Sequence, residues 1–289
     1  LGASGSERDD LNLSFLTLAA FQPEVKTLLK ANGLLIPTMQ MIWRRIVGGS
    51  EENYLSYKAH PTAMEPWNED LEHKVVSAAN QITPNTLPPF VHLRVENETF
   101  DPYREHFFTT PNSIARMFWG LEEGWISTTI NPLTNQPMPL YKIPGKAYKK
   151  SITIDASGSY DINKYKLTYH WKVLRGDPSL IQITPLNKNQ SRVRIDFTYH
   201  PERIIENTNP AIKRYSSRVD IGAFVHNGYY YSAPAFVTSY TPLNDVRKFD
   251  QYGNFQCFQK TNGYFFARLK PQGCGSSYVV CEEPEPICN

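Results

Sequence analysis

Apolar and polar residues alternate along Ser151-Ile-Thr-Ile-Asp155, which Ala156-Ser-Gly-Ser159 follows, and again along Leu167-Thr-Tyr-His-Trp-Lys-Val-Leu174. A two-residue period of this kind is typical of a β-strand with one buried face. The Ser-Gly-Ser sequence at the end of the first alternation favours a turn. These residues therefore predict two strands separated by a turn.

The same alternation recurs farther along the chain. Strands are expected at Ile181–Thr184, Arg192–Phe197, Arg218–Val225 and Tyr229–Tyr240. Between the last two, Asn227-Gly228 predicts a tight hairpin turn, because this dipeptide accepts the positive φ angles that such turns need. Short alternating strands with turn signals between them predict a β-sandwich over residues 151–245.

The opening of this region resembles polycystic-kidney-disease (PKD) type modules and their immunoglobulin-like relatives. In that family a strand, an Asp-Ala-Ser-Gly-Ser turn and a Leu-Thr-Tyr-x-Trp strand occur in the order seen at residues 152–171. The resemblance implies an immunoglobulin-like sandwich with Trp171 in its core. It covers the remaining strands only by their pattern.

The whole chain also resembles a group of uncharacterised secreted bacterial proteins. Those proteins combine a helical segment like Gly33–Ile42, an Ala59-His-Pro61 tripeptide and a sandwich of this type. This second resemblance implies a secreted or cell-surface protein, and it names no activity.

The N-terminal part has a helical rather than an alternating pattern. Apolar residues recur every three or four positions from Asp9 to Ile46, with helices meeting at Pro23 and a further helix expected at Thr38–Val47. Another helix is expected at Asn68–Ile82, and Phe90–Val95 predicts a strand.

The expected fold class is therefore α+β. We expect a mainly helical domain at 1–130, a proline-rich connector at 131–150, the PKD-like sandwich at 151–245 and a cysteine-containing tail at 246–289.

All four cysteines lie in that tail, at Cys257, Cys274, Cys281 and Cys288. In a secreted chain, an even number of clustered cysteines predicts two disulfide bonds. The spacing contains no Cys-x2–4-Cys pair, which makes a zinc site the weaker interpretation, and free thiols remain an alternative. The sequence leaves the pairing of the cysteines open.

The composition excludes some classes of function. Hydrophobic residues make up 40% of the 289 residues and aromatic residues 13%, which is typical of a globular, β-rich chain. The net charge of +2 is too small to indicate nucleic-acid binding. The most apolar stretch, Leu28–Ile36, is too short to span a membrane.

Two weak candidate sites follow from polar side chains. His60 lies near Glu65, Glu69 and Asp70 in the sequence, and a histidine beside a carboxylate can act as a general acid or base. The alternative is a structural histidine. Separately, Asp155, Asp161 and Asn163 offer oxygen ligands that could bind calcium, or they serve only as turn residues. The sequence predicts no other cofactor.

Aromatic residues provide the remaining signal. Trp119, Trp125, Tyr229, Tyr230 and Tyr231 are candidate binding residues, with packing inside the protein as the alternative. Since no catalytic motif is found, we expect an extracellular non-catalytic module that contacts protein subunits or polysaccharide. The alternative is a polysaccharide hydrolase or lyase. A deep pocket that gathers His60 and two carboxylates would favour the enzyme, and an aromatic or edge-strand surface would favour the module.

Overall fold

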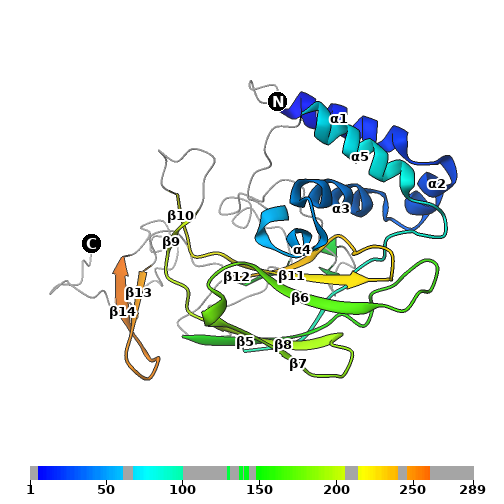
Figure 1. The fold of residues 1–289 in the computed structure, drawn as a ribbon. Helices are drawn as coiled ribbons and strands as arrows, with labels where there is room; N and C mark the ends of the chain where they lie inside the picture. Colours follow the sequence, from blue (N-terminus) through cyan, green and yellow to red (C-terminus); the bar gives the residue numbers. More distant parts are fainter. Residues whose placement is uncertain are drawn as a thin grey trace, which may run out of the picture.

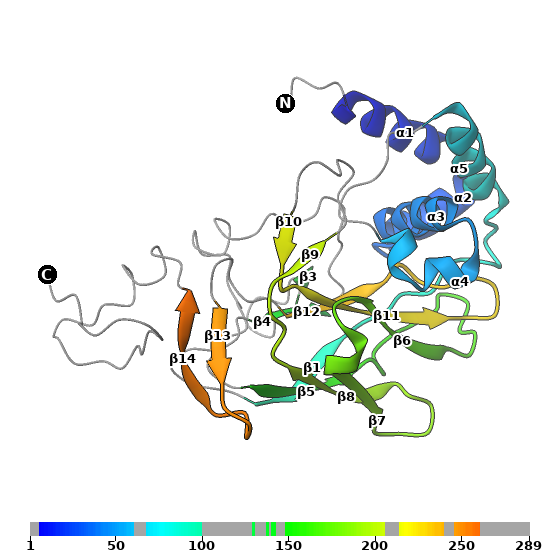
Figure 2. The same ribbon diagram turned by 60° about the vertical axis from the view of Figure 1, so that its left-hand side comes forward.

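The computed structural model describes residues 6–60, 68–99, 129–130, 137–138, 140–142, 148–205, 214–239 and 246–260. The chain is α+β, as the sequence predicts, with N-terminal helices followed by mostly antiparallel sheets (Figures 1 and 2). In this described part, no helix is long and apolar enough to cross a membrane.

The helical region comes first. Its elements are α1 (Ser6–Ala20), α2 (Pro23–Ala31), α3 (Leu35–Gly48), α4 (Glu51–Tyr54), the short 3-10 helix η1 (Tyr57–Ala59) and α5 (Glu69–Gln81). Asn68 caps α5, since its side-chain oxygen accepts a hydrogen bond from the Leu71 N–H at 3.0 Å. The predicted helices are therefore present, and α4 and η1 are additions.

Helix α3 begins earlier than Thr38, where the sequence places it. It starts at Leu35, and Pro37 lies within its first turn. A proline is tolerated there because the first N–H groups of a helix have no partner within it. Gly49 ends the helix with a left-handed φ of 71°.

Two four-stranded sheets follow. The first has the order β1 (Arg94–Glu98), β5 (Lys149–Asp155), β8 (Arg192–Thr198) and β7 (Ile181–Pro185). The second has the order β4 (Leu140–Lys142), β12 (Ala235–Ser239), β11 (Val219–His226) and β6 (Thr168–Arg175). Only the β4–β12 pair among these is parallel. The strand expected at Phe90–Val95 is β1, which begins at Arg94 and pairs with β5.

Smaller elements complete the described chain. They are β2 (Thr129–Ile130) with β3 (Pro137–Met138), the 3-10 helix η2 (Pro178–Leu180), β9 (Arg203–Ile205) with β10 (Arg214–Ser216), and β13 (Val246–Phe249) with β14 (Phe255–Lys260). The sequence patterns do not predict these short pairs.

The two large sheets pack face to face and share one core. From β5, Ile152 and Ile154 point into it, and from β11, Ile221, Ala223 and Val225 do so. The alternation that predicted these strands thus marks their inward faces.

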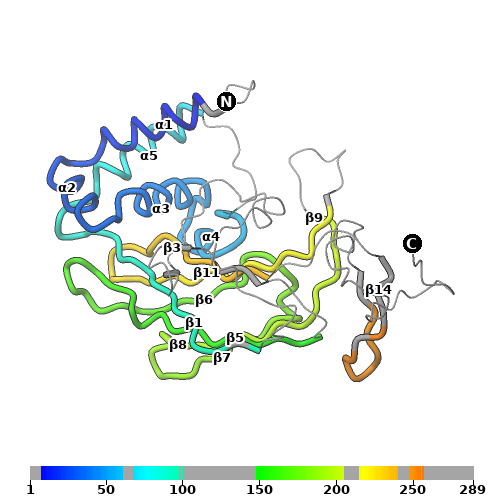
Figure 3. Tube along the Cα trace, turned by 180° about the vertical axis from the view of Figure 1, so that it is seen from behind, coloured from blue at the N-terminus to red at the C-terminus, as the bar shows by residue number. Residues whose placement is uncertain are grey.

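The helices cover the other face of the second sheet, so the molecule has three layers (Figures 1 and 3). Phe224, Leu174 and Phe236 belong to the helical core rather than to the core between the sheets. Tyr54 packs edge-on against Phe224, with ring centroids 5.5 Å apart, and its hydroxyl donates to the Ser232 carbonyl at 2.7 Å. Strand β11 is consequently buried on both faces.

The turn after β11 is longer than predicted. A bridge between His226 and Tyr231 closes it, so residues 227–230 form the loop. Gly228 alone in this loop has a positive φ, 97°, whereas a two-residue Asn-Gly turn needs positive values at both positions. The predicted hairpin between β11 and β12 is confirmed, but its loop is wider than a two-residue turn. The strand expected at Tyr229–Tyr240 is shorter, because β12 covers only Ala235–Ser239.

Trp171 is not fully in the core. Its side chain is half-buried, packs against the rim of the core between the sheets and donates its indole N–H to the Gln190 carbonyl at 2.9 Å. The reason is topological, since β6 is an edge strand with β11 on one side and no described strand on the other.

Candidate functional site

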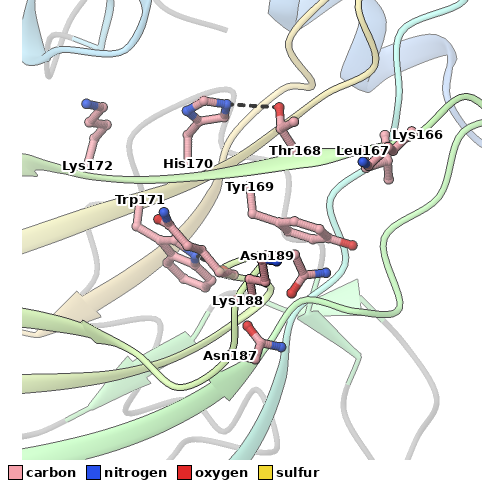
Figure 4. A pocket seen from close by; sticks show the side chains of 11 residues that line it. Lys166, Leu167, Thr168, Tyr169, His170, Trp171, Lys172, Asn187, Lys188 and Asn189 are labelled. Carbon is pink, nitrogen blue, oxygen red and sulfur yellow. Dashed lines mark hydrogen bonds between the residues drawn. The ribbon is translucent and has the colours of Figure 1, made fainter.

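A groove runs along the edge of β6 that pairs with no strand in the described part of the chain. It has a cavity volume of about 810 Å³ and lies between β6 and the loop that joins β7 to β8 (Figure 4). The strand side contributes residues 166–172, and the loop side contributes residues 187–190. We call this feature the edge groove.

The alternation of β6 divides its side chains between two faces. Tyr169 and Trp171 point toward the loop, whereas Thr168, His170 and Lys172 point the opposite way (Figure 4). The aromatic rings therefore form the strand-side wall of the edge groove, and the polar side chains surround its upper rim. Such a mixture of aromatic surface and polar groups is typical of a binding site.

The facing loop is held in place by its own hydrogen bonds. Asn187 donates to the Ser191 hydroxyl at 2.9 Å, and its side-chain oxygen accepts from the Arg192 N–H at 3.2 Å. Gln190 has a positive φ of 60°, and its carbonyl accepts the Trp171 indole hydrogen bond. The loop is therefore tied to β6 through the indole that lines the groove.

The edge groove carries positive charge. Lys166, Lys172 and Lys188 line it, all three are exposed, and none of its lining residues is acidic. Burial, followed by the nearby His226 and Lys172, lowers the pKa of His170, so His170 is neutral at pH 7. The three lysines thus provide the charge of this site. No Asp or Glu is among the residues that line the groove.

His60 lies elsewhere, in the helical core. His60 is 3% exposed, and its ring packs against the rings of Tyr54, Phe224 and Phe236. Its Nε2 donates a hydrogen bond to the Tyr54 carbonyl at 2.7 Å. His60 therefore has a structural role, because it joins the end of the helical layer, through Tyr54, to Phe224 and Phe236 of the sheet beneath. His60 lines neither the edge groove nor the two smaller cavities beside α3 and between β5 and β12.

The burial of His60 gives stability a dependence on pH. Burial lowers its pKa from 6.5 to about 3, so between these values the unfolded chain binds more protons than the folded one. Stability therefore rises with pH across this window and is lost as the pH falls from about 6.5 toward 3. Its slope has an upper limit of about 1.4 kcal/mol per pH unit for one group.

We expect His60→Gln to flatten this pH dependence relative to the parent protein. Urea denaturation at several pH values between 4 and 7 measures the slope of the free energy of unfolding against pH. His73→Gln is the matched control, because the His73 side chain is 78% exposed. Equal slopes for the parent and His60→Gln would show that His60 does not contribute.

The candidate calcium ligands face separate protein partners. Asp155 accepts hydrogen bonds from the Ser157 N–H and from Arg94. Asp161 accepts from the Tyr165 N–H, and Asn163 donates to the Pro84 carbonyl. In the described residues, no group of three or more His, Cys, Asp or Glu side chains could hold a metal ion. The side chains of the three residues thus make hydrogen bonds within turns and between loops.

Asn227 explains the shape of the nearby loop. Its buried side-chain nitrogen donates to the Leu87 carbonyl at 2.8 Å and to the Asp161 carboxylate at 2.6 Å. Its side-chain oxygen accepts from the N–H groups of Tyr229 and Tyr230. One amide thus joins three separate parts of the chain, and it places the tyrosines in a loop instead of a strand.

The three consecutive tyrosines do not form a common surface. Tyr229 is half-exposed against Tyr165, with ring centroids 5.2 Å apart, and Arg45 covers the Tyr230 ring at 5.3 Å. Tyr231 packs beside His226, with centroids 4.4 Å apart. Tyr230 and Tyr231 therefore mainly serve packing between the layers.

Other predicted site residues lie outside what can be described. Trp119, Trp125, Cys274, Cys281 and Cys288 fall outside the described residues. The backbone of Cys257 belongs to β14. The two disulfide bonds of the tail accordingly stay a prediction.

The edge groove was not among the predicted sites. The Leu-Thr-Tyr-His-Trp sequence contained its strand, and in a strand Tyr169 and Trp171 lie on one face. What the pattern lacks is the position of β6 in its sheet, because an edge strand and a central strand have the same period. Lys166 and Lys172 flank this strand in the sequence, whereas only the fold brings Lys188 near them.

No family model matches the chain, and no curated protein matches it. One solved structure is similar to part of it, a nucleoside hydrolase-related hypothetical protein from Saccharophagus degradans that is associated with carbohydrate metabolism. The two share 17% sequence identity over 37% of this chain and 23% of that chain, with a TM-score of 0.25. The match therefore covers less than a quarter of that protein's length, and its low TM-score carries no argument about function.

Proposed function

We propose that this chain is an extracellular, non-catalytic binding module with an immunoglobulin-like, PKD-like sandwich, and that its edge groove holds a polysaccharide chain. The observation that carries the proposal is the groove itself, in which Tyr169 and Trp171 face a loop rich in side-chain amides. Aromatic surfaces bind the apolar faces of sugar rings, and amides can donate to and accept from hydroxyl groups.

The strand order supports the immunoglobulin-like part of the proposal. Constant-type immunoglobulin domains have one sheet in the order A-B-E-D and another containing C-F-G. Numbered along the chain, β1, β5, β8 and β7 correspond to A, B, E and D, and β6, β11 and β12 correspond to C, F and G. On this assignment β4 is an additional strand beside G, and the edge groove lies between strand C and the D–E loop.

The extracellular location rests on the sequence. Resemblance to secreted bacterial proteins supports it, and so do the two disulfide bonds proposed for the tail, because such bonds persist in oxidising compartments. The enzyme alternative, a polysaccharide hydrolase or lyase, has less support. His60 is buried and bonded to backbone, and no carboxylate lines the edge groove.

We expect Trp171→Ala to weaken polysaccharide binding by about tenfold or more, since a central aromatic residue often dominates an interface. Retention on immobilised xylan, mannan, alginate and polygalacturonate measures the effect, with circular dichroism to verify folding. Tyr252→Ala is the matched control, because Tyr252 is 81% exposed on the β13–β14 turn.

Two results would contradict the proposal. One is a failure of the binding itself: the parent protein is retained on none of the four polysaccharides, or Trp171→Ala is retained as well as the parent. The other is release of reducing sugar from any of them by the purified protein, abolished by His60→Ala in a folded variant, which would establish the enzyme instead.

A further inference from the structure

We infer that the edge groove selects an acidic polysaccharide, a chain that carries uronate carboxylates, and binds it lengthwise along β6. This inference rests on the proposed function above and adds the chemical class and direction of the ligand. It follows from the position and surroundings of three lysines.

The lysines are distributed along the groove rather than gathered at one point. Lys172 and Lys166 lie toward opposite ends of the strand side, Lys172 with its side chain on the face of β6 that is turned away from the loop, and Lys188 projects from the loop between them (Figure 4). Six residues of extended chain span about 20 Å at roughly 3.3 Å per residue. A single sugar is too small to reach all three ammonium groups, whereas an extended chain with repeated carboxylates can meet them in turn.

Among the described residues, these lysines form no ion pair with an acidic side chain. The groove lining contains no Asp or Glu. The adjacent sheet is different, because Arg192 pairs with Glu96 and Arg194 pairs with Asp196. The positive charge of the groove therefore remains available to a ligand.

The remaining lining favours a sugar chain over other acidic polymers. Trp171 and Tyr169 present ring surface, and Asn187, Asn189 and Gln190 present amide or backbone polar groups opposite them. Hydroxyl-rich rings use both kinds of group, and an acidic peptide uses mainly the lysines. Two aromatic rings on one strand also provide fewer stacking positions than a run of nucleic-acid bases needs.

The test compares oligogalacturonates with their carboxyl-reduced, neutral counterparts of equal length by isothermal titration calorimetry. We expect the acidic form to bind about tenfold or more tightly, and its affinity to fall with added salt, because salt screens exposed charges. Affinity should also rise with chain length until the oligosaccharide fills the groove.

Variants separate the two proposals. The triple variant Lys166→Gln, Lys172→Gln, Lys188→Gln should lose the preference for the acidic form, while Lys30→Gln, Lys58→Gln, Lys248→Gln, three exposed lysines outside the groove, should keep it. Equal binding of acidic and neutral chains, or an unchanged preference in the groove variant, would overturn this inference and leave the polysaccharide module standing. Absence of binding to either form and to every polysaccharide above would overturn both.

Other polymers complete the experiment. Polyglutamate and single-stranded DNA serve as probes, because both are negatively charged, as oligogalacturonate is. Binding of either one more tightly than oligogalacturonate, with loss in the groove variant, would replace the polysaccharide by that class of ligand and refute the inference.

Discussion

Replacing Phe224 by alanine is expected to lower the free energy of unfolding by about 3–5 kcal/mol, the usual cost of removing a fully buried large aromatic side chain. Phe224 is 1% exposed and packs between the sheet and the helices, against Tyr54 and His60. The cavity left by the truncation would lie between two layers that cannot readily collapse onto it. Urea denaturation followed by circular dichroism measures the change.

Phe15→Ala is the matched control for this prediction. Phe15 is 60% exposed on α1, so its truncation should change stability by no more than about 0.5 kcal/mol. A loss of less than about 1 kcal/mol in Phe224→Ala would mean that the helices do not stabilise the sheet as the contacts indicate.

Replacing Asp220 by alanine is expected to cost about 3–5 kcal/mol as well, for an electrostatic reason. The Asp220 carboxylate is fully buried and accepts hydrogen bonds from Arg175 at 3.0 Å, Arg218 at 2.8 Å and Thr238 at 2.7 Å. Without it, two partly buried guanidinium groups face each other with no carboxylate between them. Thermal and urea unfolding of the variant measure the loss.

An exposed ion pair on α5 provides the control for Asp220→Ala. Asp70→Asn removes a carboxylate that pairs with Lys74 on the surface of α5, and should cost no more than about 1 kcal/mol. If both variants lost equally little, the buried cluster around Asp220 would contribute no more than a surface pair.

Local sequence patterns predicted the regular elements well where one face is buried. Ile152 and Ile154 alternate with polar residues, and β5 follows that pattern; the helical spacing of apolar residues over 68–82 predicted α5. These patterns depend only on residues that are close in sequence, so they predict an element without knowledge of the rest of the fold. Pro37 misled the prediction because proline fits anywhere in the first helical turn, not only at its first residue.

The errors at Trp171 and Asn227 have a different cause. The local sequence around Trp171 is the same whether its strand is central or at an edge, and only the sheet order makes it half-buried. The turn at Asn227 depends on the Leu87 carbonyl and the Asp161 carboxylate, which are distant in sequence. The candidate site could not be predicted for the same reason, since it joins β6 to a loop that only the fold brings near.

The burial of β11 on both faces has an evolutionary consequence. A relative that lost the helices would expose Phe224, Leu174 and Phe236 together, and no single substitution would restore a soluble surface. The helices and this strand must therefore be inherited as a unit and change in concert. The exposed lysines of the edge groove belong to neither core, so among descendants of one ancestor the charge of this groove can diverge while the three layers stay the same.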